Sequence, residues 1–113
     1  MIDPLGDYEV VSETRTKEAA LRLLRLKAGQ RVLPHFHRHC TQVYLIIAGS
    51  VDIQLGDGHL WAKQYDTVRI PPMTVHSLKA IDAALVLSTT TPPLLSEDQI
   101  SLAPGKKTAS GGE

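Results

Sequence analysis

Short runs of alternating apolar and polar residues occupy the middle of the chain and predict β-strands. Residues 51–55 place their apolar side chains on one face, and residues 67–70 alternate in the same way before Pro71-Pro72, which ends a strand. Residues 42–48 and 83–88 are rich in β-branched and other apolar side chains, as buried strands are. Six or more short strands at a spacing of roughly 8–12 residues favour an all-β sandwich or barrel.

A glycine-containing turn and one ambiguous segment complete this pattern. Gly56-Asp57-Gly58 suits a tight hairpin turn, with residues 59–62 as the returning strand. Residues 18–27 are rich in helix formers, and Glu18 can pair with Arg22 at helical spacing. The leucines of this segment also fit a strand that switches faces. Because all its neighbours are predicted strands, we predict a strand there as well.

The two ends of the chain differ in composition from its middle. Residues 1–18 are polar and mixed, which predicts an N-terminal arm that packs on the domain or on a neighbour. Residues 92–113 begin with two prolines and end in a glycine-containing stretch, which is typical of a C-terminal tail. A β-barrel domain is left at 19–91, and a chain of 113 residues is too short for a second one.

Composition and charge exclude several classes of protein. There are 12 basic and 12 acidic residues and few aromatic ones, so nucleic-acid binding is not expected. No apolar run is long enough to span a membrane, and Met1 is not followed by a secretory signal. A single Cys rules out an internal disulfide framework. These features predict a soluble cytoplasmic domain.

The histidines are the chemical feature that stands out. His35 and His37 are two residues apart, so on a strand they share one face with Cα atoms about 6.6 Å apart. Both imidazoles could then bind one ion at about 2.0–2.1 Å. His76 could supply a third ligand and Gln42 an amide oxygen. A lone His-x-His pair is more often a surface or core feature than a metal site. We expect His39 and His59, both beside turns, to lie outside the site.

The spacing of these residues resembles the first conserved motif of the cupins. Five residues separate Gly29 from His35, four separate His37 from Gln42, and six lead on to Gly49. A second segment is similar to the second cupin motif, but only in part. Its positions are occupied by Tyr65, Pro71, Met73, His76 and Ala80. The resemblance covers residues 19–90 and is to small bacterial single-domain cupins of the RmlC-like kind.

This resemblance implies a jelly-roll barrel, also called a double-stranded β-helix, with a divalent metal ion inside. The ion would be Fe, Mn, Ni or Zn, and its implied ligands are His35, His37, Gln42 and His76. We expect the substrate pocket to be lined by Leu33, Tyr44, Ile46 and Met73. Cupins also commonly pair through their outer sheets, which implies a homodimer.

Several departures from the cupin motifs carry information. Gln42 stands where the family usually has Glu, and a neutral amide ligates weakly and cannot act as a base. The full charge of the ion would then remain, which favours an anionic or enolate ligand. Met73 replaces a turn glycine, so the turn there should not require a positive φ. Tyr65 replaces another glycine, which we interpret as a local change of turn without chemical meaning. Cys40 is either a reactive thiol beside the metal or, as we favour, a small buried hydrophobic residue.

Two functions from different classes remain open. The first is a mononuclear metal-dependent dioxygenase or isomerase that acts on a small enolisable or aromatic substrate. The second is a non-catalytic module that binds or senses a small ligand or a metal. A metal-free epimerase of the cupin type would need a His–Asp pair, and no Asp neighbours the histidines in sequence. The catalytic residues are not identified from the sequence.

Overall fold

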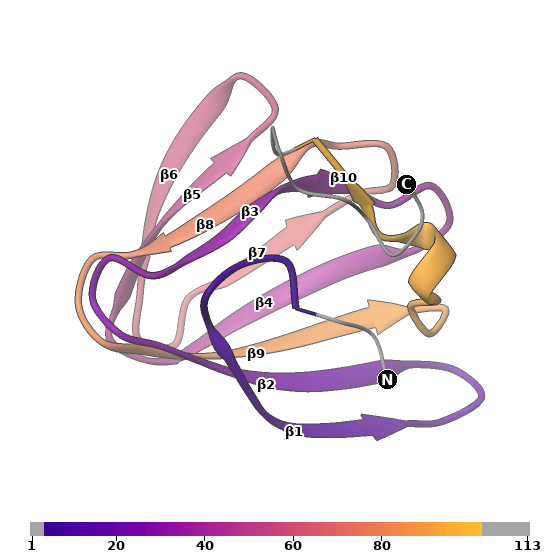
Figure 1. Cartoon of the computed structure of the whole chain (residues 1–113), viewed down its shortest axis with the longest axis horizontal. Coiled ribbons are helices and arrows are strands. Elements are labelled where there is room, and N and C mark those ends of the chain that lie inside the picture. The colour runs from indigo at the N-terminus through magenta and orange to yellow at the C-terminus, as the bar shows by residue number, and fades with distance from the viewer. Residues whose placement is uncertain (1–3, 103–113) are drawn as a thin grey trace.

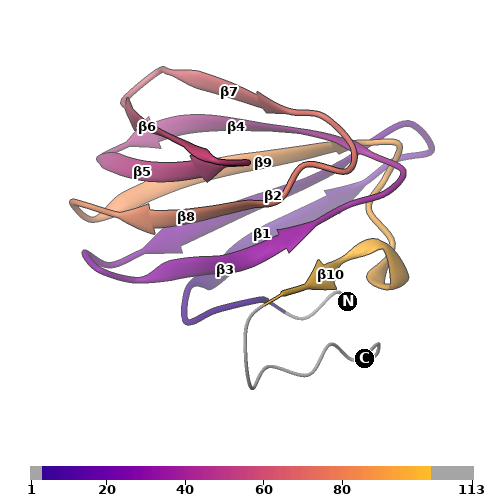
Figure 2. The same cartoon turned by 90° about the horizontal axis from the view of Figure 1, so that it is seen from above.

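Two antiparallel β-sheets face one another in the computed structural model, which describes residues 4–102 (Figure 1) (Figure 2). The first five-stranded sheet has the order β1 (Glu9–Arg15), β2 (Ala20–Leu26), β9 (Ala84–Thr91), β4 (Thr41–Ala48), β7 (Thr67–Ile70). The second has the order β10 (Ile100–Ser101), β3 (Arg31–Phe36), β8 (His76–Ala80), β5 (Ser50–Leu55), β6 (Gly58–Lys63). A short 3₁₀ helix, η1 (Ser96–Asp98), precedes β10. The prediction of an all-β jelly roll, a double-stranded β-helix, is confirmed.

The space between the sheets is apolar at one end and polar at the other. Strand alternation directs every second side chain inward, where apolar residues form one core cluster. Its most buried members are Leu26, Ile46, Val51, Ile53, Ala62 and Val86. Toward the other end the inward positions are polar, and they include Gln42, Ser88 and Thr90. The apolar end therefore supports the fold, and the polar end holds the candidate chemistry.

The ambiguous segment is a strand, but its side chains do not switch faces. In β2 the inward positions are Ala20, Arg22, Leu24 and Leu26. Leu21 and Leu23 lie on the outer face, where they are half-buried. The predicted change of faces along the strand does not occur. The alternation stays regular, and Arg22 occupies one of its buried inward positions.

The predicted arm is part of the barrel. β1 pairs with β2 along its length, Leu5 and Tyr8 are buried, and the Leu5 amide donates a hydrogen bond of 3.0 Å to the Tyr8 hydroxyl. The segment just before β1 contacts the other sheet, because the Asp7 carboxylate accepts the amide of Arg31 in β3. The boundary predicted at residue 18 is therefore wrong for the described residues, and residues 1–3 lie outside them.

The predicted tail also begins too early. Leu94 is buried, η1 packs at the mouth of the barrel, and β10 pairs with β3 (Figure 1). Residues 92–102 therefore belong to the folded domain, and the tail predicted over 103–113 lies outside the described residues. No helix within residues 4–102 combines the length and the apolar character that crossing a membrane requires.

The prediction that the turn at Met73 does not require a positive φ is wrong. Tyr65 has a φ of 74° and Met73 a φ of 67°, so both turns keep the left-handed conformation although neither residue is glycine. The Met73 amide donates to the carbonyl of His37 at 2.7 Å, and the Tyr65 amide donates to that of Ile46 at 2.6 Å. These backbone bonds hold both turns in a conformation that side chains disfavour.

We predict that Tyr65→Gly and Met73→Gly each stabilise the protein. The left-handed conformation costs a non-glycine residue about 1–2 kcal/mol of folding free energy, and glycine avoids this cost. Glycine loses about 0.5–1 kcal/mol of the gain, because its unfolded chain has more conformational freedom. Little packing is lost, because the Tyr65 and Met73 side chains are 76% and 63% exposed. Thermal unfolding should show a higher midpoint for each variant.

Gly29→Ala is the matched control for these two variants. Gly29 has a φ of 87°, and a Cβ added there would meet no atom within 4 Å, so only the backbone conformation opposes the alanine. This variant should unfold at a lower temperature. If the glycine variants lose stability as Gly29→Ala does, the strain assigned to Tyr65 and Met73 is absent.

Candidate metal centre

Three buried histidines converge at the polar end of the barrel. His35 at the end of β3 and His76 at the start of β8 are directly paired across the sheet, and His37 follows β3. The ring centroids are 4.2 Å apart for His35 and His76, 4.9 Å for His35 and His37, and 5.2 Å for His37 and His76. One ring nitrogen from each lies within 4.8 Å of the others. The structure thus brings together the three histidines that the sequence singled out.

A bulge in β3 sets which residues face this cluster. The register of the β3–β8 pair shifts between Val32 and His35, so Val32 and His35 both point inward although they are three positions apart. Leu33 is half-buried and lies outside the core cluster, and its place in the substrate pocket stays a prediction. Simple alternation could not anticipate this change of face.

The same type of hydrogen bond, from Nδ1 to a backbone carbonyl, fixes the orientation of each of the three rings. Nδ1 of His35, His37 and His76 lies 2.8, 2.8 and 2.9 Å from the carbonyl oxygens of Leu33, Asp98 and Thr74, respectively. A carbonyl oxygen only accepts, so each Nδ1 carries the proton and each Nε2 presents a lone pair. Metal-binding histidines are held in this way by their second nitrogen.

Burial keeps the three imidazoles neutral. It is the main cause that lowers the pKa of His35 well below its usual value and lowers that of His37. For His76, burial lowers the pKa to about 4. Neutral imidazole is the form that binds a metal, so at neutral pH the cluster is ready to do so. Nε2 of His76 is buried and has no hydrogen-bond partner among residues 4–102.

Gln42 completes the set of donors. Its Oε1 lies 3.2 Å from Nε2 of His37, and its amide nitrogen donates to Oγ of Ser88 at 2.7 Å, which fixes the direction of the amide. The neutral His37 ring carries one N–H group, and this group already donates its hydrogen bond to the carbonyl of Asp98. Nε2 and Oε1 therefore face each other with lone pairs, an arrangement that a cation between them would satisfy. These donors fit a divalent ion.

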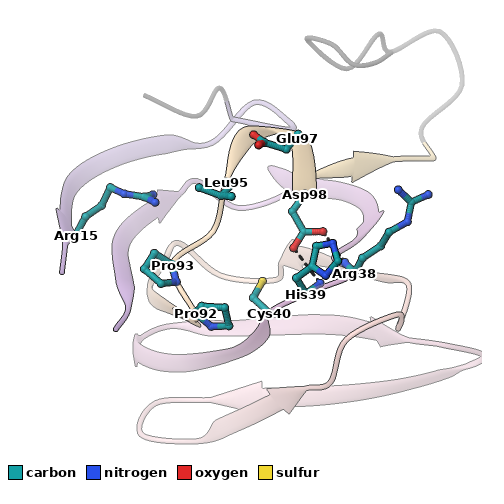
Figure 3. A pocket seen from close by; sticks show the side chains of 9 residues that line it. All are labelled: Arg15, Arg38, His39, Cys40, Pro92, Pro93, Leu95, Glu97 and Asp98. Carbon is teal, nitrogen blue, oxygen red and sulfur yellow. Dashed lines mark hydrogen bonds between the residues drawn. The ribbon is translucent and has the colours of Figure 1, made fainter. Parts of the chain in front are cut away.

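Asp98 anchors the loop that carries His37. Its carboxylate accepts the amides of Arg38 at 2.6 Å and His39 at 3.1 Å (Figure 3). Its carbonyl accepts the Nδ1 proton of His37. The thiol of Cys40 also bonds to this carboxylate. Sequence analysis missed Asp98, because no local pattern links it to a histidine 61 positions earlier.

The neighbouring group of His37, Cys40 and Asp98 is not a second metal site. Its donor atoms lie within 4.8 Å of one another, but the carboxylate and the Nδ1 proton are already bonded. Burial is the main cause that raises the pKa of Cys40 to about 12, so the thiol keeps its proton. Cys40 packs against Leu94 as a small buried residue, the role we favoured.

A pocket of about 660 Å³ opens on the other side of Asp98 (Figure 3). Its lining residues come from β1, the loop after β3 and the segment after β9: Arg15, Arg38, His39, Cys40, Pro92, Pro93, Leu95, Glu97 and Asp98. None of the three clustered histidines lines it. Asp98 lines this pocket and also accepts the Nδ1 proton of His37, so it connects the pocket to the histidine cluster.

The remaining predicted residues are divided between the site and the surface. The ring of Tyr44 lies 6.3 Å from that of His76, and burial raises its pKa, so the phenol is neutral. Ile46 is fully buried in the core cluster. Met73 is mostly exposed at a left-handed turn, and its place in the substrate pocket stays a prediction. His39 and His59 are exposed and lie outside the cluster, as predicted.

Comparison with known proteins decides the fold. No family model matches the chain. The cupin domain of Cnp3 from Schizosaccharomyces pombe matches with a TM-score of 0.67 and 14% identity, over 80% of this chain and 67% of that chain. The chain has the cupin fold. A variant of oxalate decarboxylase from Bacillus subtilis gives a TM-score of 0.75 at 18% identity, over 89% of this chain and 29% of that one.

One curated protein is similar to this cupin-fold chain in sequence. Mannose-1-phosphate guanylyltransferase RfbM from Salmonella typhimurium is 24% identical over 76 residues. These residues are 67% of this chain and 15% of that enzyme, so the chain spans only a small part of its relative. The likeness to the solved structures shows a shared fold.

We predict that Asp98→Ala destabilises this cupin barrel by about 2–4 kcal/mol, because two partly buried backbone hydrogen bonds lose their charged acceptor. Asp98→Asn keeps one acceptor oxygen and should lose about half as much. Glu97→Gln, at the exposed neighbouring position, is the control and should leave stability unchanged. Chemical denaturation measures all three. Equal stability of Asp98→Ala and Glu97→Gln would refute the anchoring role.

Proposed function

We propose that this protein binds a divalent metal ion through His35, His37 and His76, with Oε1 of Gln42 as a further ligand. The observation that carries the proposal is the common orientation of the rings. Each Nδ1 donates to a backbone carbonyl, and the buried Nε2 of His76 has no hydrogen-bond partner within the part of the chain that the structure describes. Three imidazoles and an amide oxygen suit Fe, Mn, Ni or Zn.

The ligand of this centre is a small organic molecule. A bound ion would act as a Lewis acid toward a carbonyl or carboxylate oxygen. Around it, Tyr44 is a neutral hydroxyl beside His76, and Ser88 holds Gln42 in place. The oxalate decarboxylase that shares this fold is named for a small organic acid, which supports a ligand of that size.

A mononuclear metal-dependent dioxygenase or isomerase is the leading form of this proposal. A non-catalytic ligand-binding or sensor module is the alternative, and a specific observation favours it. Gln42 cannot accept a proton at neutral pH, and the carboxylate of Asp98 already accepts two backbone amides. The chain therefore offers no ready general base at either position, and chemistry that requires one is disfavoured.

The metal proposal predicts about one divalent ion per chain in protein purified without an affinity tag. His76→Ala removes one of three imidazoles and should lose most of the metal. His59→Ala removes an exposed histidine and should retain it. Elemental analysis after dialysis measures the content. The proposal fails if wild type and His76→Ala carry the same trace of metal.

The metal-loaded protein then separates the two forms of the proposal. Oxygen consumption and product NMR are followed with a panel of small diketones, catechols and enolisable acids. Turnover that is lost in His76→Ala supports the enzyme. Full metal content without turnover of any compound supports the module.

We also propose that the chain forms a homodimer through the outer face of the β2–β9–β4 sheet. Leu23, Leu87 and Leu45 are register partners and form a continuous apolar row across the three strands. All three are only half-buried in the single chain. A second copy would cover this row and remove its apolar surface from water.

Leu87→Lys is therefore expected to give a monomer, because it places a charge at the centre of the row. Ser77→Lys, on the outer face of the other sheet, is the control and should remain dimeric. Sedimentation velocity measures the mass of each variant. A wild-type monomer at high concentration would contradict the proposed dimer.

A further inference from the structure

The pocket beside Asp98 has the size and the lining of a binding site for a small molecule. Its volume of about 660 Å³ falls within the range of about 300–1,000 Å³ that is usual for such sites. Cys40 and Asp98 are buried and form its floor, and Leu95 lines it with a side chain that is 51% exposed. Pro92 and Pro93 lie next to each other along one side (Figure 3). Apart from Asp98, these lining side chains are apolar.

The charged side chains of the pocket are already engaged by the protein. The Asp98 carboxylate accepts three hydrogen bonds from the loop that follows β3. Nη1 of Arg15 donates to the carbonyl of Leu94 at 2.7 Å. The guanidinium of Arg38 lies 5.9 Å from the centre of the Phe36 ring. These groups therefore do not require an ion of opposite charge as a ligand.

The charges around the pocket also balance. Arg15 and Arg38 contribute two positive charges, Glu97 and Asp98 contribute two negative charges, and His39 is counted as neutral. An anion in the pocket would approach the buried carboxylate of Asp98, and a cation would approach the two guanidinium groups. A neutral ligand avoids both repulsions, so the lining favours a neutral molecule.

A flat aromatic ring suits these surroundings. Guanidinium groups stack on aromatic faces, and both arginines of the pocket are exposed at its rim. A ring that packs against Leu95 and the two prolines removes apolar surface of both partners from water. We propose that this pocket binds a small neutral aromatic molecule. None of the three clustered histidines lines it, so this site is separate from the candidate metal centre.

Occupancy of the pocket is coupled to the candidate metal centre through η1, and this coupling rests on the proposed metal-binding function. The lining comes partly from residues 92–98 and partly from β1 and the loop after β3, so the pocket is complete only while η1 is docked. His37 has its Nδ1 acceptor only in the same docked state, because that acceptor is the carbonyl of Asp98. The aromatic ligand and the ion thus favour one state, and each strengthens the binding of the other.

Fluorine NMR with three probes that share one ring tests the pocket. The probes are para-fluorobenzyl alcohol, para-fluorobenzoate and para-fluorobenzylammonium, which are neutral, negative and positive, respectively. We expect the alcohol to bind most tightly, and Leu95→Ala to weaken its binding about fivefold or more through lost apolar contact. Leu102→Ala is the matched control, because Leu102 is also 51% exposed but does not line the pocket. This control should bind the alcohol as wild type does.

The inference is overturned if the alcohol does not bind or if both alanine variants weaken it equally. Tighter binding of a charged probe that Leu95→Ala also weakens overturns it as well. The backbone amide signals of Arg38 and His39 locate the site, and they should shift when the alcohol is added. The signal of Ser77, on the outer face of the other sheet, should not. A shift at Ser77 without one at Arg38 and His39 places the probe elsewhere and refutes the site.

Cobalt(II) binding tests the coupling. We expect a saturating concentration of the alcohol to raise the cobalt affinity of wild type about fivefold or more, and that of Leu95→Ala by less. Unchanged cobalt affinity in wild type refutes the coupling. A wild type that takes up no cobalt refutes the metal centre and the coupling together, while the fluorine titration still decides whether the pocket binds the aromatic probe.

Discussion

Three imidazoles can share one buried volume only if all of them are uncharged and all have their second nitrogen satisfied elsewhere. The barrel meets both conditions. Burial disfavours the protonated rings, and three backbone carbonyls take the Nδ1 protons. The bulge in β3, the turn before β8 and the position of η1 all serve to place those carbonyls. The fold around the site is arranged by this requirement.

The three carbonyls that accept the Nδ1 protons lie at different sequence separations from their histidines. His35 and His76 each bond to the carbonyl two residues earlier, so the same local backbone geometry is used twice. His37 instead depends on Asp98 in the segment that follows β9. This segment would be dispensable if it were only a tail. In the structure it supports one ring of the cluster and closes the pocket beside it.

Local patterns allowed most of the fold and part of the site to be predicted. Strand positions follow from alternation, and the His-x-His spacing is local, so the histidine cluster could be anticipated. The inward position of Arg22 was hidden because its segment has the composition of a helix, and the register shift between Val32 and His35 leaves no sequence signal. Asp98 could not be found, since its contacts join positions far apart in sequence. Tyr65 and Met73 show that hydrogen bonds from the surrounding backbone can override a residue's own preference for φ.

The bond between His37 and Asp98 also sets an order of events. A ribosome adds Asp98 long after His37, so a nascent chain exposes all three histidines before the last ring has its acceptor. At that stage the rings are solvated, mobile and free to bind ions in other geometries. The site acquires its final shape only when η1 has been synthesised and has docked. If the proposed ion is bound, its capture in the final geometry therefore comes late in the synthesis and folding of the chain.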